Sequence, residues 1–158
     1  MLDNFEKDLT TGKRGEDIVL KVFSSLDSER TYERVADNPL YYYKGDIKVT
    51  DKSGDVRYIE VKNDSVIHNT GNVLCEEEVY YKKYDYYGKG NMSSDYDIYA
   101  VVSEQRREIY VINFERLKQI YRKGIYKEIE HKQQITYCFL LDINEIDRLG
   151  GLIAVVNY

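Results

Sequence analysis

The sequence predicts an α/β fold with a central mixed β-sheet flanked by helices. Three observations predict it. An N-terminal segment has apolar residues at helical spacing, several later segments alternate apolar and polar residues as strands do, and a second amphipathic helical segment follows two of those strands. The length of 158 residues favours one domain that spans 1–158.

The first helix is expected over 13–26, where apolar residues recur at helical spacing between 18 and 26. Thr10 or Thr11 is a suitable N-cap for it. Glu16 lies three residues before Val19, which places it on the inward stripe of this helix or at the edge of the stripe.

A β-hairpin is expected over 41–63, because apolar and polar residues alternate on both sides of the turn sequence DKSGD. If Asp51 and Asp55 flank a three-residue loop, Gly54 takes the left-handed position at its end. In the register set by the pair Asp51 and Asp55, the numbers of any two residues that face each other across the hairpin add up to 106. Asp46 then lies opposite Glu60.

The rest of the chain alternates strands with short helices. In chain order we expect a short strand at 72–75, exposed connections at 76–78 and 82–94, strands at 95–102 and 107–113, a helix at 114–123, a strand at 134–142, a short helix at 144–151 and an apolar segment of undefined type at 152–158. This order favours one mixed sheet with helices against it.

Composition limits the classes of protein to which the chain can belong. Hydrophobic residues make up 42% and charged residues 32%, which is typical of a globular protein. No apolar run is long enough to cross a bilayer and the N-terminus lacks a signal-peptide pattern, so we expect a cytoplasmic protein without a membrane partner. Cys75 and Cys138 belong to no metal-binding motif, and we expect free thiols.

The net charge of −5 argues against a large non-specific DNA-binding surface, which usually has a basic excess. It does not exclude an enzyme that acts on nucleic acid, because a carboxylate metal site itself adds negative charge that a bound cation offsets.

The pattern (D/E)-x-K occurs three times, and its context separates the copies. Two of them, at 46–48 and 60–62, lie on the two arms of the predicted hairpin. The third, at 130–132, lies in a polar stretch without strand alternation, and we expect it to be solvated surface.

Two carboxylates that face each other across a strand pair repel by up to about 1 kcal/mol. A divalent cation between Asp46 and Glu60 would turn this repulsion into coordination, and hard cations such as Mg²⁺ prefer carboxylate oxygens. Lys62 follows Glu60 by two residues and therefore points to the same face. An ammonium there can stabilise negative charge that builds on a phosphate.

Together, Glu16 in an N-terminal helix, Gly45-Asp46 on one strand and the run Ile59-Glu60-Val61-Lys62 on the next resemble the PD-(D/E)xK nuclease superfamily. The segment 13–16 is similar to the start of the Holliday-junction resolvase-type members. Gly45 stands where many members have proline.

The resemblance implies a restriction-endonuclease-like core and a nuclease that hydrolyses DNA phosphodiester bonds with Mg²⁺ or Mn²⁺. It also implies metal ligands at Asp46, Glu60 and the Val61 carbonyl, catalytic residues Glu16, Asp46, Glu60 and Lys62, DNA as the partner, and a homodimer.

Other interpretations remain open from the residues alone. Asp46 could be a strand-edge acid that pairs with Lys48 or Lys62, and Glu16 could be a first-turn acid favoured by the helix dipole. The charge run that begins at Glu76 could be solvated, or its first member could approach the metal. A non-catalytic binding module on the same fold, or a hydrolase of smaller phosphoesters, is the alternative to a nuclease.

Overall fold

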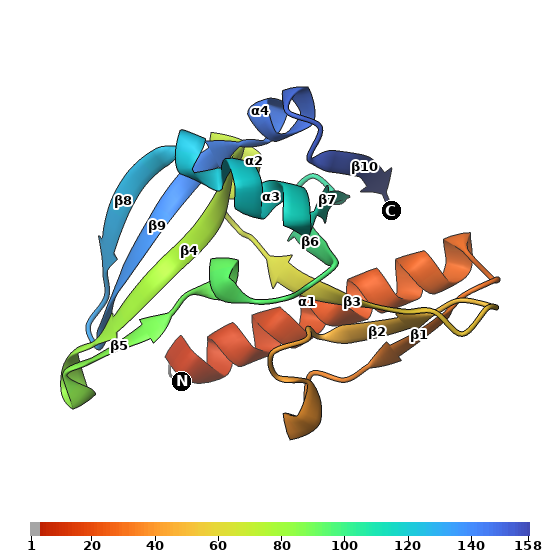
Figure 1. Ribbon diagram of the computed structural model, residues 1–158, viewed down its shortest axis with the longest axis horizontal. Helices are drawn as coiled ribbons and strands as arrows, with labels where there is room; N and C mark the ends of the chain where they lie inside the picture. The colour runs from red at the N-terminus through yellow and green to blue at the C-terminus, as the bar shows by residue number, and fades with distance from the viewer. Residues whose placement is uncertain (1–3) are drawn as a thin grey trace.

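The computed structural model describes residues 4–158, which form two β-sheets with helices packed against them (Figure 1). The helices are α1 (Asn4–Leu26), α2 (Ile67–Thr70), α3 (Phe114–Ile120) and α4 (Ile143–Arg148). Short 3-10 turns are η1 (Pro39–Tyr41), η2 (Lys82–Tyr84), η3 (Asn91–Ser93) and η4 (Tyr121–Lys123). The strands are β1 (Thr31–Arg34), β2 (Ile47–Thr50), β3 (Val56–Asn63), β4 (Asn72–Tyr81), β5 (Tyr86–Lys89), β6 (Ile98–Ser103), β7 (Glu108–Asn113), β8 (Ile125–Glu130), β9 (Gln134–Asp142) and β10 (Leu152–Asn157).

The larger sheet is mixed, with strand order β1-β2-β3-β6-β7-β10. Its β3–β6 pair is parallel, and its other pairs are antiparallel. A parallel pair needs a crossover between its strands. Here the crossover contains α2, β4 and β5, so it also starts the smaller sheet, which is antiparallel with order β5-β4-β9-β8. The prediction of an α/β fold with a mixed sheet is therefore confirmed. The prediction of one sheet is wrong, because β4, β5, β8 and β9 form a second sheet of their own.

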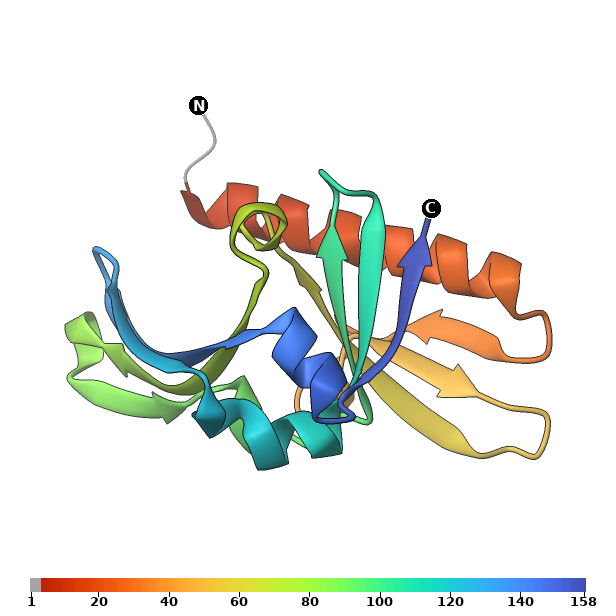
Figure 2. The ribbon, with the colours of Figure 1, turned by 90° about the horizontal axis from the view of Figure 1, so that it is seen from above.

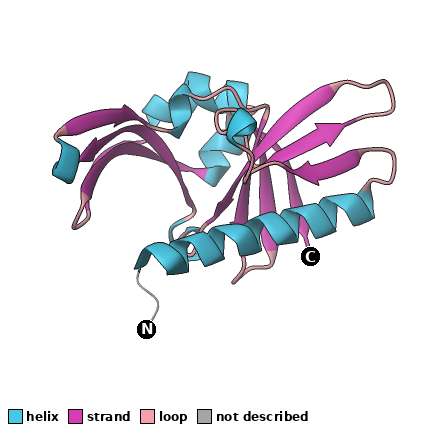
Figure 3. Cartoon of the chain, turned by 90° about the horizontal axis from the view of Figure 1, so that it is seen from below, coloured by secondary structure: helices cyan, strands magenta, loops and turns pink. Residues whose placement is uncertain are grey.

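Two apolar cores cover the two faces of the larger sheet. On one face α1 buries Val19 against β2, β3 and β6, and Figures 2 and 3 show α1 running along the sheet. On the other face the smaller sheet, α3 and α4 enclose a second core that includes Tyr99, Phe114 and Ile146. Alternate residues of β3 therefore belong to different environments: Ile59 and Val61 face α1, and Glu60 faces away from it.

The predicted hairpin is confirmed over its strands and corrected at its start. Ile47 pairs with Ile59 and Thr50 with Val56, so paired numbers sum to 106 as predicted. Gly54 has a φ of +91° at the end of the turn, and Asp51 N–H donates to the Asp55 carbonyl at 3.0 Å. Residues 41–45, however, form no strand, because η1 and a turn occupy them.

Helix α1 begins at Asn4, nine residues before the predicted start at residue 13, so capping by Thr10 or Thr11 is wrong. Several strands lie where none was predicted, among them β1, β5 and β8. The copy of (D/E)-x-K at 130–132 begins at Glu130, the last residue of β8. The C-terminal segment is β10, an edge strand. Within residues 4–158, no helix combines the length and the apolar character needed to cross a bilayer.

Candidate active site

Asp46 is bonded to the backbone of β3 on both sides of Glu60. Its own N–H donates to the Ile59 carbonyl at 2.8 Å, and its Oδ2 accepts from the Val61 N–H at 2.9 Å. Gly45 makes this approach feasible, because its φ is +130° and an added Cβ would lie 2.8 Å from the Ile59 oxygen. The backbone turn at Gly45 thus sets the position of Asp46 beside β3.

The carboxyl groups of Asp46 and Glu60 are close enough to share a hydrogen bond when one is protonated. Burial raises the pKa of Glu60 to about 9, with the Asp46 carboxylate as the second cause and Lys62 opposing both. Burial also raises the pKa of Asp46, while the bond from Val61 N–H lowers it. Two acids held this close in a partly desolvated place favour a bound proton or cation.

Lys62 is exposed at the end of the face that carries Glu60. Its positive charge lowers the pKa of Glu60, so the two groups are within electrostatic reach of each other. The ammonium is free to meet a ligand from solvent because its side chain is not packed into the core.

Glu16 is only 9% exposed and lies near the middle of α1, so the interpretation as a first-turn acid is wrong. Burial raises its pKa to about 7, and the next cause is the Asp46 carboxylate. Gly15 allows α1 to approach β3, since an added Cβ there would lie 2.8 Å from the Cβ of Asn63. The structure therefore brings Glu16, Asp46, Glu60 and Lys62 to one region of the molecule.

Arg34, at the end of β1, was not identified from the sequence. Its Nε lies 3.0 Å from Oε2 of Glu16, and its guanidinium also pairs with Asp17. Its charge lowers the pKa of both Glu16 and Asp46. Because β1 has only four residues and no clear apolar alternation, this ion pair could not be predicted from the sequence.

Tyr96 is a second residue that sequence reasoning missed. Its ring is buried against Phe114, with centroids 4.9 Å apart, and the phenol lies within electrostatic reach of Glu60. Burial is the main cause that raises the pKa of this phenol, followed by the negative charge of Glu60. A tyrosine between two aspartates carries no motif, and only the fold places it beside the acid.

The charge run at 76–78 was predicted to be an exposed connection, which is wrong, because it lies within β4 and Glu76 is half-buried. Both cysteines are buried free thiols, as predicted.

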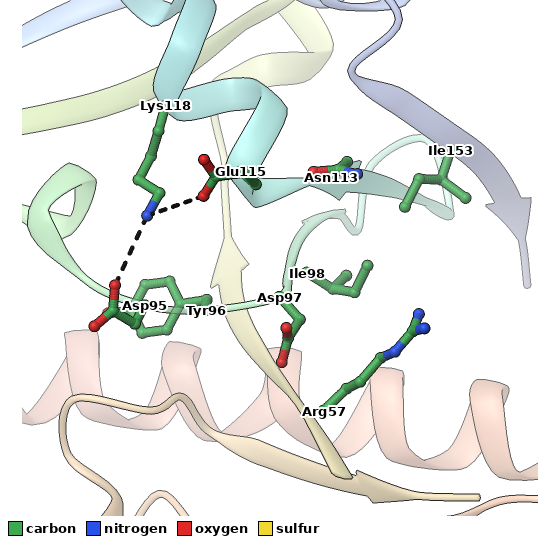
Figure 4. Close-up of a pocket in the computed structure, with 9 residues that line it drawn as sticks. All are labelled: Arg57, Asp95, Tyr96, Asp97, Ile98, Asn113, Glu115, Lys118 and Ile153. Atoms are coloured by element: carbon green, nitrogen blue, oxygen red, sulfur yellow. Dashed lines mark ion pairs between the residues drawn. The ribbon is translucent and has the colours of Figure 1, made fainter. Parts of the chain in front are cut away.

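Tyr96 also lines a pocket of about 450 Å³ (Figure 4). Lys118 Nζ lies there 3.4 Å from Glu115 and 3.8 Å from Asp95, and Arg57 lines the pocket. A second pocket of about 470 Å³ lies against α1, where Arg14 Nε is 2.7 Å from Glu104. Both pockets mix acidic and basic side chains, so neither is matched to a ligand of one charge.

Among the residues described, no three His, Cys, Asp or Glu side chains form a group that could hold a metal ion. The donors at Asp46 and Glu60 nevertheless fit Mg²⁺, which keeps several waters and is commonly held by one or two carboxylates. Within residues 4–158, no lysine forms an ion pair with Asp46, so its interpretation as the partner of Lys48 or Lys62 is not supported.

The chain matches no protein-family model, no curated protein and no solved structure at a significant level.

Proposed function

We propose that this chain is a metal-dependent nuclease that hydrolyses DNA phosphodiester bonds on a restriction-endonuclease-like core of the PD-(D/E)xK type. The observation that carries the proposal is the placement of Asp46, which is hydrogen-bonded to the backbone on both sides of Glu60. This placement keeps Asp46, just before β2, next to Glu60 although the repulsion between two carboxylates destabilises the fold.

Asp46, Glu60 and the Val61 carbonyl would hold Mg²⁺ or Mn²⁺. In an extended strand the N–H and C=O of one residue point to the same side, and the Val61 N–H points to Asp46. The Val61 carbonyl therefore points toward the same edge of β3. This donor set consists of oxygen atoms, as hard cations require.

The metal would lower the pKa of an attacking water and polarise the phosphate. Glu60 must lose its proton before both carboxylates can face one cation, because its pKa is about 9 without one. Lys62 would stabilise the charge that develops on the phosphate. Glu16 would act as an accessory acid after its ion pair with Arg34 is partly broken. A homodimer is proposed on the resemblance alone.

The test is cleavage of a panel of plasmid, single-stranded and branched DNA with Mn²⁺. We expect cleavage by the wild type and a loss of about 10²–10³-fold in Lys62→Ala. Lys132→Ala is the matched control, because this exposed lysine belongs to the third (D/E)-x-K copy and should retain full activity. Equal cleavage by wild type and Lys62→Ala would exclude the assigned site.

A non-catalytic binding module on the same fold is the second candidate, and one contact favours it. Arg34 already neutralises Glu16 from within the chain, which leaves less negative charge for a cation. This candidate predicts no effect of Mg²⁺ or Mn²⁺ on the melting temperature, whereas the nuclease predicts an increase.

A further inference from the structure

The segment at 36–45, between β1 and β2, exposes three large apolar side chains. Leu40 is 82% exposed, Tyr42 63% and Tyr43 84%. In Figure 1 the segment projects away from the larger sheet. Its internal hydrogen bonds include Leu40 N–H to Asn38 Oδ1 at 3.1 Å, so these side chains project from an ordered turn.

Both ends of this 36–45 loop are fixed near Asp46. The Asp46 carbonyl accepts hydrogen bonds from the N–H groups of Val35 at 2.8 Å and Ala36 at 3.1 Å. At the other end, Tyr43 is only three residues from Asp46, which limits their Cα separation to about 11 Å. Whatever binds Tyr43 therefore lies close to the candidate metal ligands.

The loop continues onto the face that carries Glu60. Tyr41 packs on Tyr58 with ring centroids 5.9 Å apart, and Lys44 Nζ lies 5.4 Å from the centroid of the Tyr58 ring. Tyr58 and Glu60 are two residues apart on β3, so they share one face at a spacing of about 7 Å. The rings of Tyr41 and Tyr58 thus form a row that ends beside the carboxyl groups of Asp46 and Glu60.

Positive charge accompanies this row. Lys44, Lys48 and Lys62 lie on or beside the same face, Lys48 through its pairing with Tyr58. The exposed Glu33 pairs with Lys48 on the neighbouring strand and weakens its attraction for an anion. Lys44 and Lys62, on the two sides of the acids, are then the better partners for phosphate.

We infer that the 36–45 loop binds unpaired bases of DNA, so that the substrate of the proposed nuclease has a single-stranded segment beside the cut. The inference rests on the proposed function for the cutting step. Tyrosine rings offer stacking surfaces to any base, and an exposed leucine suits insertion between base steps. A duplex matches this chain less well, because it presents twice the charge density of one strand and the chain has a net charge of −5.

The test is binding of a fluorescein-labelled 20-nucleotide DNA strand, the matching duplex, and a duplex with a single-stranded flap, followed by anisotropy in EDTA. We expect the wild type to bind the strand and the flap at least tenfold more tightly than the duplex. Tyr42→Ala/Tyr43→Ala should lose at least about tenfold in affinity for the strand. Lys44→Ala should reduce the salt slope by about 0.7.

Tyr84→Ala/Tyr86→Ala is the matched control, because these tyrosines, in η2 and β5, are 70% and 60% exposed. It should bind as the wild type does. Equal affinity of wild type and Tyr42→Ala/Tyr43→Ala, or no preference for unpaired DNA, would overturn the inference and point to a protein partner for the loop.

The two proposals can fail separately. Suppose that only Tyr42→Ala/Tyr43→Ala loses binding of the DNA strand in EDTA, and that neither wild type nor any variant cleaves DNA in Mn²⁺. This result would support the loop as a base-binding site and exclude only the nuclease proposal. Cleavage with unchanged strand binding in Tyr42→Ala/Tyr43→Ala would support the nuclease and overturn the loop assignment.

Discussion

The Val61 N–H donates a hydrogen bond of 2.9 Å to Oδ2 of Asp46, and this bond ties the start of β2 to the middle of β3. It holds one carboxyl next to another, since Glu60 immediately precedes Val61. The energy of the arrangement then depends on whether a proton or a cation lies between the two acids.

Stability without metal should fall as the pH rises. The pKa of Glu60 is raised from its ordinary value of 4.5 to about 9, so the folded state keeps a proton that the unfolded state releases. The stability that the folded state gains from this bound proton is fully present below pH 4.5 and is lost as the pH rises to about 9. Glu16, at about 7, adds to the lower part of this range.

Glu60→Gln should therefore flatten the loss of melting temperature between pH 7 and pH 9 in EDTA, because glutamine cannot ionise. Glu128→Gln, at an exposed position of β8, is the control and should keep the wild-type slope. Parallel profiles for wild type and Glu60→Gln would show that Glu60 is already ionised at pH 7.

Mg²⁺ or Mn²⁺ should stabilise the wild type. A cation at 100 times its dissociation constant adds about 2.7 kcal/mol, which corresponds to a rise of about 5–10 °C for a chain of this length. Asp46→Asn removes one ligand and should abolish the rise. Asp147→Asn, an exposed position in α4, should retain it. A similar rise in Asp46→Asn would place any bound cation elsewhere.

The sequence predicted the part of the site that depends on local geometry. The turn at 51–55 sets the β2–β3 register, and this register is enough to place Asp46 beside Glu60. It did not predict the detail at Asp46, whose N–H bonds to Ile59 because Gly45 turns the backbone at a φ of +130°. The prediction extended the regular strand pairing beyond Ile47, where β2 begins, and regular pairing does not allow for a turn at Gly45.

The parts that were missed depend on contacts between distant segments. Arg34 reaches Glu16 only because β1 pairs with β2 in the larger sheet and α1 packs on a face of that sheet. Tyr96 reaches Glu60 because β6 pairs with β3 in parallel after a crossover of more than thirty residues. In the smaller sheet, β5 and β8 lack regular alternation of apolar and polar residues, so the sequence pattern did not predict these two strands.

Gly45→Ala should destabilise the fold and disturb the site together. The new Cβ would lie 2.8 Å from the Ile59 oxygen at a φ that only glycine adopts readily, and we expect a loss of about 3 kcal/mol or more. Gly54→Ala is the matched control, because Gly54 also has a positive φ but no atom within 4 Å of the added Cβ. It should lose only about 1–2 kcal/mol.

Urea unfolding with and without Mn²⁺ measures both effects. Gly45→Ala should also show a smaller stabilisation by Mn²⁺ than Gly54→Ala does, since the backbone shift displaces Asp46. Equal losses of stability in the two variants would mean that the Ile59 carbonyl moves aside easily and that Gly45 does not fix the acid.

Two glycines of α1 should respond in opposite directions to the same substitution. Gly12→Ala meets no atom within 4 Å and should stabilise the helix by about 0.5–1 kcal/mol. Gly15→Ala would bring a Cβ to 2.8 Å from the Cβ of Asn63 and 3.5 Å from Val61 Cγ1, and overpacking of this kind costs about 1–3 kcal/mol. The difference should appear as opposite shifts of the urea midpoint with an unchanged m-value.

Gly15→Ala should also lower DNA cleavage, because α1 must move away from β3 and Glu16 moves with the neighbouring residue. Gly12→Ala should leave cleavage unchanged. If Gly15→Ala were as stable and as active as Gly12→Ala, the close contact of α1 with β3 would have no part in positioning Glu16, and its role as an accessory acid would lose its structural basis.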